Sequence, residues 1–121
     1  MMSTKAESNR SGKVHRSWGY YKVLHQENDT VKVKELVVNP NGFLSMQRHE
    51  KRAEHWFVSE GTASVYTLDD GLSMIGKFTK FESLHIDRKQ WHQLKNETDN
   101  PLKIVEIQYG ENCIEDDIER I

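Results

Sequence analysis

The chain has 121 residues, of which 36% are hydrophobic and 30% charged, and its formal net charge is −2. This length and composition favour one domain with a single apolar core beneath a well-solvated surface. There is no apolar window of the ~20 residues that a membrane span needs and no clustered basic excess, so neither a membrane nor a nucleic acid is expected as a partner.

The N-terminal residues and the cysteine content bear on the compartment. Residues 1–13 are polar and aperiodic, which predicts a disordered or loosely attached arm in front of one domain over residues 14–121. The arm lacks the apolar stretch of a signal peptide, and the single cysteine, Cys113, excludes an internal disulfide. We therefore expect a soluble, cytoplasmic protein.

From Val14 onward the pattern is that of short β-strands. Runs of β-branched and aromatic residues predict the strands, and turn signals such as Asn39-Pro40-Asn41-Gly42 separate them. The predicted strands are residues 20–24, 31–38, 43–49, 53–59, 63–68, 74–78, 83–86, 91–94 and 103–109. Only residues 115–121 are compatible with a helical turn. The strands together predict an all-β jelly roll or barrel.

The candidate chemistry lies between residues 47 and 56. Gln47 and His49 are two residues apart, so on a strand their side chains project from one face. A short turn would return Glu54 beside them, and His92 is the best fourth donor from a distant strand. This mixed nitrogen and oxygen set suits one divalent metal ion, with zinc expected first and cobalt, manganese, iron or nickel as alternatives. A Gln-x-His pair alone, however, is more often an ordinary polar face.

The same residues resemble the two sequence motifs of the cupin superfamily. The first motif has His-x-His, then a glutamate and a glycine, and the second ends in a histidine followed four positions later by an asparagine. The matching residues are Gln47, His49, Glu54 and Gly61 in the first motif, and His92 and Asn96 in the second. The Pro-x-Gly usual in the second motif is absent here.

Glutamine in place of the first histidine resembles the cupin domain of type II phosphomannose isomerases. Further agreement comes from residues 16–20, 44–47, 52–56, 61–63, 106–110 and 115–120. The resemblance implies a cupin, or double-stranded β-helix, barrel that forms a homodimer. It also implies a metal-dependent isomerase that interconverts mannose 6-phosphate and fructose 6-phosphate through a cis-enediol(ate), with a small-molecule sugar phosphate as its partner.

The remaining site residues are assigned by the needs of this reaction. Proton transfer is expected from Lys51, Glu106 or Gln108, because isomerisation moves a proton between C2 and C1. Arg52 and Arg120 are the candidate phosphate ligands, because a guanidinium binds phosphate oxygens in pairs. Ordinary surface ion pairs are the alternative for both arginines.

Two departures from the family keep other functions open. Phe43 stands where the family usually has a basic residue, and Lys51 where it commonly has a histidine. These changes allow a non-catalytic, metal-containing sugar-binding or regulatory cupin. A metal-dependent dioxygenase is a third interpretation, which Gln47 disfavours because such enzymes usually use three histidines or two histidines and one carboxylate.

Overall fold

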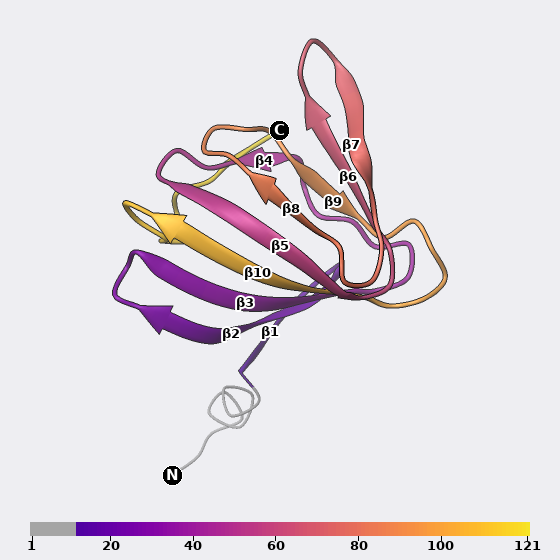
Figure 1. The fold of residues 1–121 in the computed structure, drawn as a ribbon, viewed down its shortest axis with the longest axis horizontal. Helices are drawn as coiled ribbons and strands as arrows, with labels where there is room; N and C mark the ends of the chain where they lie inside the picture. The colour runs from indigo at the N-terminus through magenta and orange to yellow at the C-terminus, as the bar shows by residue number, and fades with distance from the viewer. Residues whose placement is uncertain (1–11) are drawn as a thin grey trace.

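All regular structure in the described residues, 12–121, is β-strand in this computed structural model (Figure 1). The strands are β1 (Lys13–Arg16), β2 (Gly19–Glu27), β3 (Val31–Val38), β4 (Gln47–Arg48), β5 (Arg52–Glu60), β6 (Ala63–Leu68), β7 (Leu72–Phe78), β8 (Ser83–Ile86), β9 (Gln93–Lys95), β10 (Leu102–Gly110) and β11 (Glu119–Arg120). The predicted all-β class is confirmed. Within residues 12–121 we find no helix long and apolar enough to cross a lipid bilayer.

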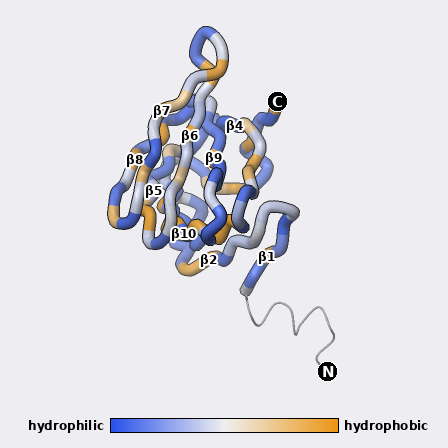
Figure 2. The backbone as a smooth tube through the Cα atoms, turned by 90° about the vertical axis from the view of Figure 1, so that its right-hand side faces the viewer, coloured by the Kyte–Doolittle hydropathy of each residue, from blue (hydrophilic) through white to orange (hydrophobic). Residues whose placement is uncertain are grey.

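The strands pair antiparallel in three sheets. The largest sheet has the order β1-β2-β3-β10-β5-β8, a three-stranded sheet has the order β7-β6-β9, and β11 pairs with β4. The β6–β7 hairpin extends beyond the body of these sheets, as Figures 1 and 2 show. Neighbours in the large sheet come from distant parts of the sequence, since β10 lies between β3 and β5.

The predicted elements differ from the observed ones in three places. The helical turn expected over residues 115–121 is limited to one turn at residues 115–116, and Glu119 and Arg120 pair instead with the edge formed by Arg48 and Gln47. The strand expected over residues 43–49 is reduced to β4, since the chain before it makes only intermittent backbone bonds, such as Leu44 to Leu94 at 2.9 Å. Most of the predicted N-terminal arm, residues 1–11, lies outside the described residues, and Lys13 already belongs to β1.

The interior is apolar towards one end and polar towards the other. The apolar end contains Leu36, Val38, Trp56, Val58, Ala63, Val65, Ile86, Leu94, Leu102 and Ile104. Three neighbouring strands then change character along their inner face, where Lys32 and Lys34 of β3, Glu106 and Gln108 of β10, and Arg52 and Glu54 of β5 are buried. Every second side chain of these strands therefore still points inward at this end, but into a polar chamber instead of the apolar core.

Candidate metal centre

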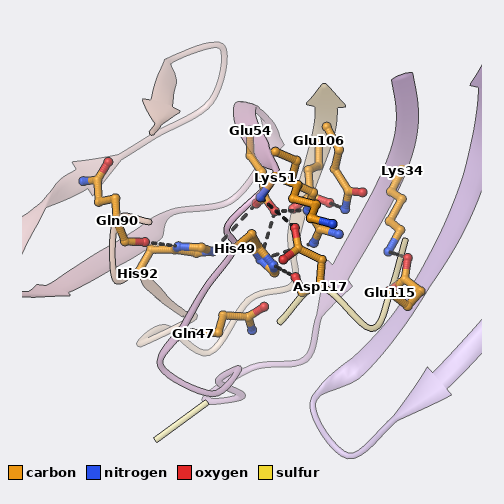
Figure 3. Close-up of polar contacts among 12 residues, drawn as sticks. Lys34, Gln47, His49, Lys51, Glu54, Gln90, His92, Glu106, Glu115 and Asp117 are labelled. Atoms are coloured by element: carbon orange, nitrogen blue, oxygen red, sulfur yellow. Dashed lines mark hydrogen bonds and ion pairs between the residues drawn. The ribbon is translucent and has the colours of Figure 1, made fainter. Parts of the chain in front are cut away.

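Three side chains from separate segments converge in the polar end of the interior (Figure 3). One potential ligand atom from each of His49, Glu54 and His92 lies within 4.8 Å of the other two. Glu54 belongs to β5, whereas His49 follows β4 and His92 precedes β9. The backbones of Gln47 and His92 exchange two hydrogen bonds of 2.9 Å, which brings the distant His92 beside the turn after β4.

Backbone carbonyls fix the orientation of both imidazoles. Nδ1 of His49 lies 2.6 Å from the carbonyl oxygen of Asp117, and Nδ1 of His92 lies 2.9 Å from that of Gln90. A carbonyl can only accept, so each Nδ1 carries a proton, and in the neutral form of either ring the lone pair is on Nε2. These Nε2 atoms lie 3.2 Å and 3.8 Å from the two carboxylate oxygens of Glu54. Ligating histidines are commonly oriented in this way.

The pKa values of His49 and Glu54 are shifted in the directions that favour binding of a cation. Burial lowers the pKa of His49, which favours the neutral imidazole that a metal requires. Burial opposes ionisation of Glu54, but the positive charge that His92 and His49 carry when protonated, together with that of Arg52, outweighs it and keeps the pKa of Glu54 well below its ordinary value. An ionised carboxylate beside two imidazole lone pairs is a donor set for zinc and for other first-row divalent ions.

Arg52 already provides a positive charge at this place. Its Nε lies 3.1 Å from Oε2 of Glu54, and its Nη2 lies 3.2 Å from Nε2 of His49. Because that nitrogen has one lone pair, a metal ion on His49 must replace this contact with Arg52. The same donor atoms therefore face a positive charge whether Arg52 or a metal ion occupies this place. The residues present fit a divalent metal ion.

Gln47 lies at the edge of the cluster. Its backbone pairs with His92, and its amide nitrogen lies 3.3 Å from the hydroxyl of Ser45. This leaves the amide oxygen without a hydrogen bond to any described residue, and the side chain lines the same cavity as Glu54 and His92. The amide oxygen of Gln47 is therefore available as an acceptor at the cavity wall.

The cluster opens into a cavity of about 610 Å³. Its lining is strongly charged: Arg16, Lys34, Arg52 and Arg120 are basic, and Glu54, Glu106, Glu115 and Asp116 are acidic. Aromatic rings, including those of Trp18 and Tyr21 from the β1–β2 hairpin, line it as well. A chamber of this size and polarity suits a small, charged, hydroxyl-rich ligand.

A second buried carboxyl stands next to the cluster. The indole nitrogen of Trp56 donates to Glu54 and to Glu106, each at 3.0 Å, and Gln108 donates to Glu106 at 2.7 Å. Burial raises the pKa of Glu106, and the negative charge of Glu54 raises it further. The other atom of the Gln108 amide, Oε1, is buried without a hydrogen-bond partner among the described residues.

The remaining sequence-predicted residues have different environments. Lys51, predicted as a candidate for proton transfer, is exposed in the turn before β5 and is not among the residues that line the cavity. Arg52 is buried, and its guanidinium is committed to Glu54, His49 and the carbonyl of Ile114, which leaves it poorly placed for phosphate. Arg120 is exposed and lines the cavity without a described side-chain partner.

Sequence reasoning missed several contributors to this chamber. Trp56 bridges the two carboxyls through its indole nitrogen. Lys34 and Glu115 form an ion pair inside the cavity, and Asp117 orients His49. The strict alternation of residues 31–34 put the lysines of β3 on one face, but nothing in the sequence marked that face as the inner one.

Comparison with known proteins identifies related chains. The family described as "Mannose-6-phosphate isomerase C-terminal" matches residues 3–121. The alginate biosynthesis protein AlgA of Pseudomonas aeruginosa is 38% identical over 117 residues, which are 97% of this chain and 23% of that protein. A mannose-1-phosphate guanylyltransferase of Escherichia coli is 37% identical over 120 residues, covering 96% of this chain and 24% of the relative. The chain thus spans about a quarter of the length of these relatives.

Solved structures resemble the chain in fold. The capsular polysaccharide assembling protein CapF of Staphylococcus aureus superposes with a TM-score of 0.78 at 15% identity, over 90% of this chain and 33% of that one. An oxalate decarboxylase of Lactobacillus farciminis gives a TM-score of 0.74 at 17% identity, again over 90% of this chain and 33% of that one. These likenesses confirm the predicted cupin-type jelly roll.

Proposed function

The chain belongs to the mannose-6-phosphate isomerase C-terminal family, and on that premise we propose that its cavity interconverts mannose 6-phosphate and fructose 6-phosphate. The observation that carries the proposal is the buried cluster of His49, Glu54 and His92, which opens into a charged cavity beside Glu106. This reaction moves a proton between C2 and C1 through a cis-enediol(ate), so it needs stabilisation of an oxygen anion and a group that carries the proton.

The metal-binding residues meet the first need. His49, Glu54 and His92 would hold one divalent ion, with Gln47 as an added oxygen donor, and such an ion would supply Lewis-acid stabilisation of the developing negative charge. The carbonyls of Asp117 and Gln90 keep Nε2 of each histidine directed at this place. Zinc as the ion and the cytoplasm as the compartment, both expected from the sequence, and a homodimer as the assembly, which the family resemblance implies, are further proposals.

We assign proton transfer to Glu106 on the basis of its position. It is a buried carboxyl in the cavity wall, next to Glu54 and linked to it through the indole of Trp56. Gln108 fixes its orientation with a hydrogen bond of 2.7 Å. Burial excludes bulk water from this carboxyl, so a proton that it exchanges with C1 or C2 returns to substrate rather than to solvent.

A coupled isomerase assay with mannose 6-phosphate tests the proposal. The purified protein is stripped with a chelator and then supplied with zinc, cobalt or manganese. We expect fructose 6-phosphate to form only after a metal is restored, and we expect Glu106→Gln to bind metal normally but to turn over slowly. Absence of turnover with every metal, from protein that still binds one, would contradict the isomerase assignment.

One observation favours a second candidate, a metal-containing sugar-binding cupin without catalysis. Phe43, which replaces a residue that is usually basic in the family, lines the cavity and is 59% exposed. An aromatic ring at this place offers a surface for stacking on a sugar rather than a charge for phosphate. Tight binding of mannose 6-phosphate by metal-loaded protein that shows no turnover would support this alternative.

A further inference from the structure

Two lysines of β3 are buried at the polar end of the interior. Lys32 and Lys34 are only 7% and 5% exposed, and both ammonium groups bind the same oxygen of Glu115, at 3.1 Å and 2.8 Å. Figure 3 shows Lys34 and Glu115 paired, β3 on one side and the C-terminal segment on the other. Glu106, the buried carboxyl opposite Lys34 on β10, has a pKa that burial raises, so Glu115 is the carboxylate that balances both ammonium groups, and buried charge is costly unless it is compensated.

The side chain of Glu115 is far more exposed than the two lysines that it binds. Its side chain is 52% exposed, although the lysines that it pairs with are almost fully buried. Lys34 and Glu115 both line the cavity, and Nζ of Lys34 also lies 4.2 Å from the centre of the Tyr21 ring. A carboxylate that reaches two buried amines from the solvent side occupies the place that an incoming anion would take.

We propose that Lys34, supported by Lys32, binds the phosphate group of the sugar substrate, and that the carboxylate of Glu115 occupies this subsite until the substrate displaces it. The inference deepens the proposed function, because it rests on a sugar phosphate being the ligand of the cavity. A phosphate monoester carries up to two negative charges and three acceptor oxygens, so it matches two ammonium groups better than one carboxylate does.

The strand register places this subsite at a useful distance from the metal centre. Gln108 of β10 lies opposite Glu54 of β5 on one side and opposite Lys32 of β3 on the other. Glu106 lies between Trp56 and Lys34 in the same way. The strand that carries Glu54 and the strand that carries the two lysines are therefore separated by two strand spacings, about 10 Å. A hexose phosphate in extended form has its reacting carbons at one end and its phosphate at the other, and it fits this separation.

The side chain of Gln108, on β10 between β5 and β3, has a buried oxygen without a hydrogen-bond partner among the described residues. Oε1 of Gln108 accepts no hydrogen bond from any described residue, although the side chain is only 1% exposed and lines the cavity. A buried acceptor without a donor is costly, which indicates that a ligand or a water satisfies it. A hydroxyl from the middle of the sugar chain supplies such a donor while the phosphate lies at Lys34.

Titration calorimetry of the zinc-loaded protein with mannitol 6-phosphate tests the subsite without turnover, because a hexitol phosphate has no carbonyl to isomerise. Mannitol is the matched ligand that lacks the phosphate. We expect Lys34→Met to weaken mannitol 6-phosphate binding about 10- to 100-fold, as for a lost charged hydrogen bond, and to leave mannitol binding unchanged. We expect Glu115→Gln to strengthen phosphate binding several-fold, because the resident carboxylate no longer competes. Glu119→Gln, which removes a tail carboxylate that pairs with Arg48 outside the cavity, should have no effect.

The gain in Glu115→Gln separates this subsite from a structural role of the ion pair, since a structural role predicts equal or weaker binding. Unchanged affinity in Lys34→Met, or no gain in Glu115→Gln, would overturn the proposal. The isomerase assay is scored separately: turnover with unaltered phosphate binding in Lys34→Met refutes only the subsite, whereas phosphate binding at Lys34 without turnover refutes only the isomerase.

Discussion

The carbonyl oxygen of Asp117 lies 2.6 Å from Nδ1 of His49, a residue 68 positions earlier in the chain. The carboxylate of the same aspartate accepts hydrogen bonds from the backbone N–H groups of Glu50 and Lys51, at 3.1 Å and 2.9 Å. The C-terminal segment therefore holds both the orientation of a candidate metal ligand and the turn that carries it. Partners of this kind usually influence metal affinity strongly.

Replacement of Asp117 by alanine should loosen that turn. The backbone carbonyl remains, but two hydrogen bonds to a charged carboxylate are lost, so we expect the free energy of unfolding to fall by about 1–2 kcal/mol. Zinc affinity should fall about tenfold, because the His49 ring is less well oriented. Competition with a chromogenic chelator measures the affinity. Glu119→Ala, which removes only an exposed ion pair with Arg48, should match the wild type in affinity.

Loss of a clustered histidine should have a larger effect. His49→Ala and His92→Ala each remove one nitrogen donor, so zinc affinity should fall by more than the about 10–100-fold typical for an outer partner. His55→Ala is the control, since the His55 ring faces His85, 6.4 Å away between centroids, on the other side of β5. Metal content by mass spectrometry after dialysis gives the readout. Full zinc occupancy in His92→Ala would show that the ligand set is wrong.

Gln47→Ala tests whether Gln47 coordinates the metal ion or only lies next to the site. If the free amide oxygen coordinates the ion, its removal should weaken zinc binding measurably, though less than loss of either histidine, because water can take the vacated position. Gln47→Glu should restore or exceed the wild-type affinity, since a carboxylate is a stronger oxygen donor. Equal affinities in all three proteins would mean that Gln47 contacts the substrate or nothing, rather than the metal.

The sequence was most informative where local pattern and packing agree. The β-branched residues of 31–38 and the turn at residues 39–42 predicted β3 and its end, and the spacing from Gln47 to Glu54 predicted that a short turn would bring donors together. His92 was the best candidate for a donor from a distant strand and also matched the second cupin motif, but its pairing with Gln47 joins segments 45 residues apart, a separation that spacing rules do not cover.

The sequence was least informative about which face of a strand is inside. In β3 the valines at 31 and 33 suggest an apolar core face, yet Lys32 and Lys34 are the buried residues, since this end of the interior is polar. The sequence likewise suggested that Arg52 is available to bind a phosphate, whereas in the fold its guanidinium contacts Glu54 and His49. The C-terminal segment was misread because its structure comes from pairing with β4 rather than from local preference.

Trp56→Phe should destabilise the protein although the ring stays apolar. The indole N–H is the shared donor to Glu54 and Glu106, and its loss leaves two buried carboxyl oxygens without that hydrogen bond. We expect the free energy of unfolding to fall by about 2–3 kcal/mol, measured by urea denaturation. Trp91→Phe makes the same chemical change where no described acceptor is bound by the indole nitrogen, and it should cost less. Similar losses in both variants would indicate that ring volume, rather than the shared donor, matters.

Glu115 should make stability depend on pH in a defined direction. Burial raises the pKa of this carboxyl, but hydrogen bonds and positive charge from Lys34 and Lys32 outweigh burial, so the folded pKa is lower than the ordinary value of about 4.3. A carboxyl with a lowered pKa stabilises the fold above its unfolded pKa, and this contribution disappears as pH falls through the folded pKa. The wild type should therefore exceed Glu115→Gln in free energy of unfolding above about pH 5, and the difference should shrink towards about pH 3. Urea denaturation across this range measures it, and a difference that does not vary with pH would mean that the Glu115 carboxylate does not stabilise the buried lysines.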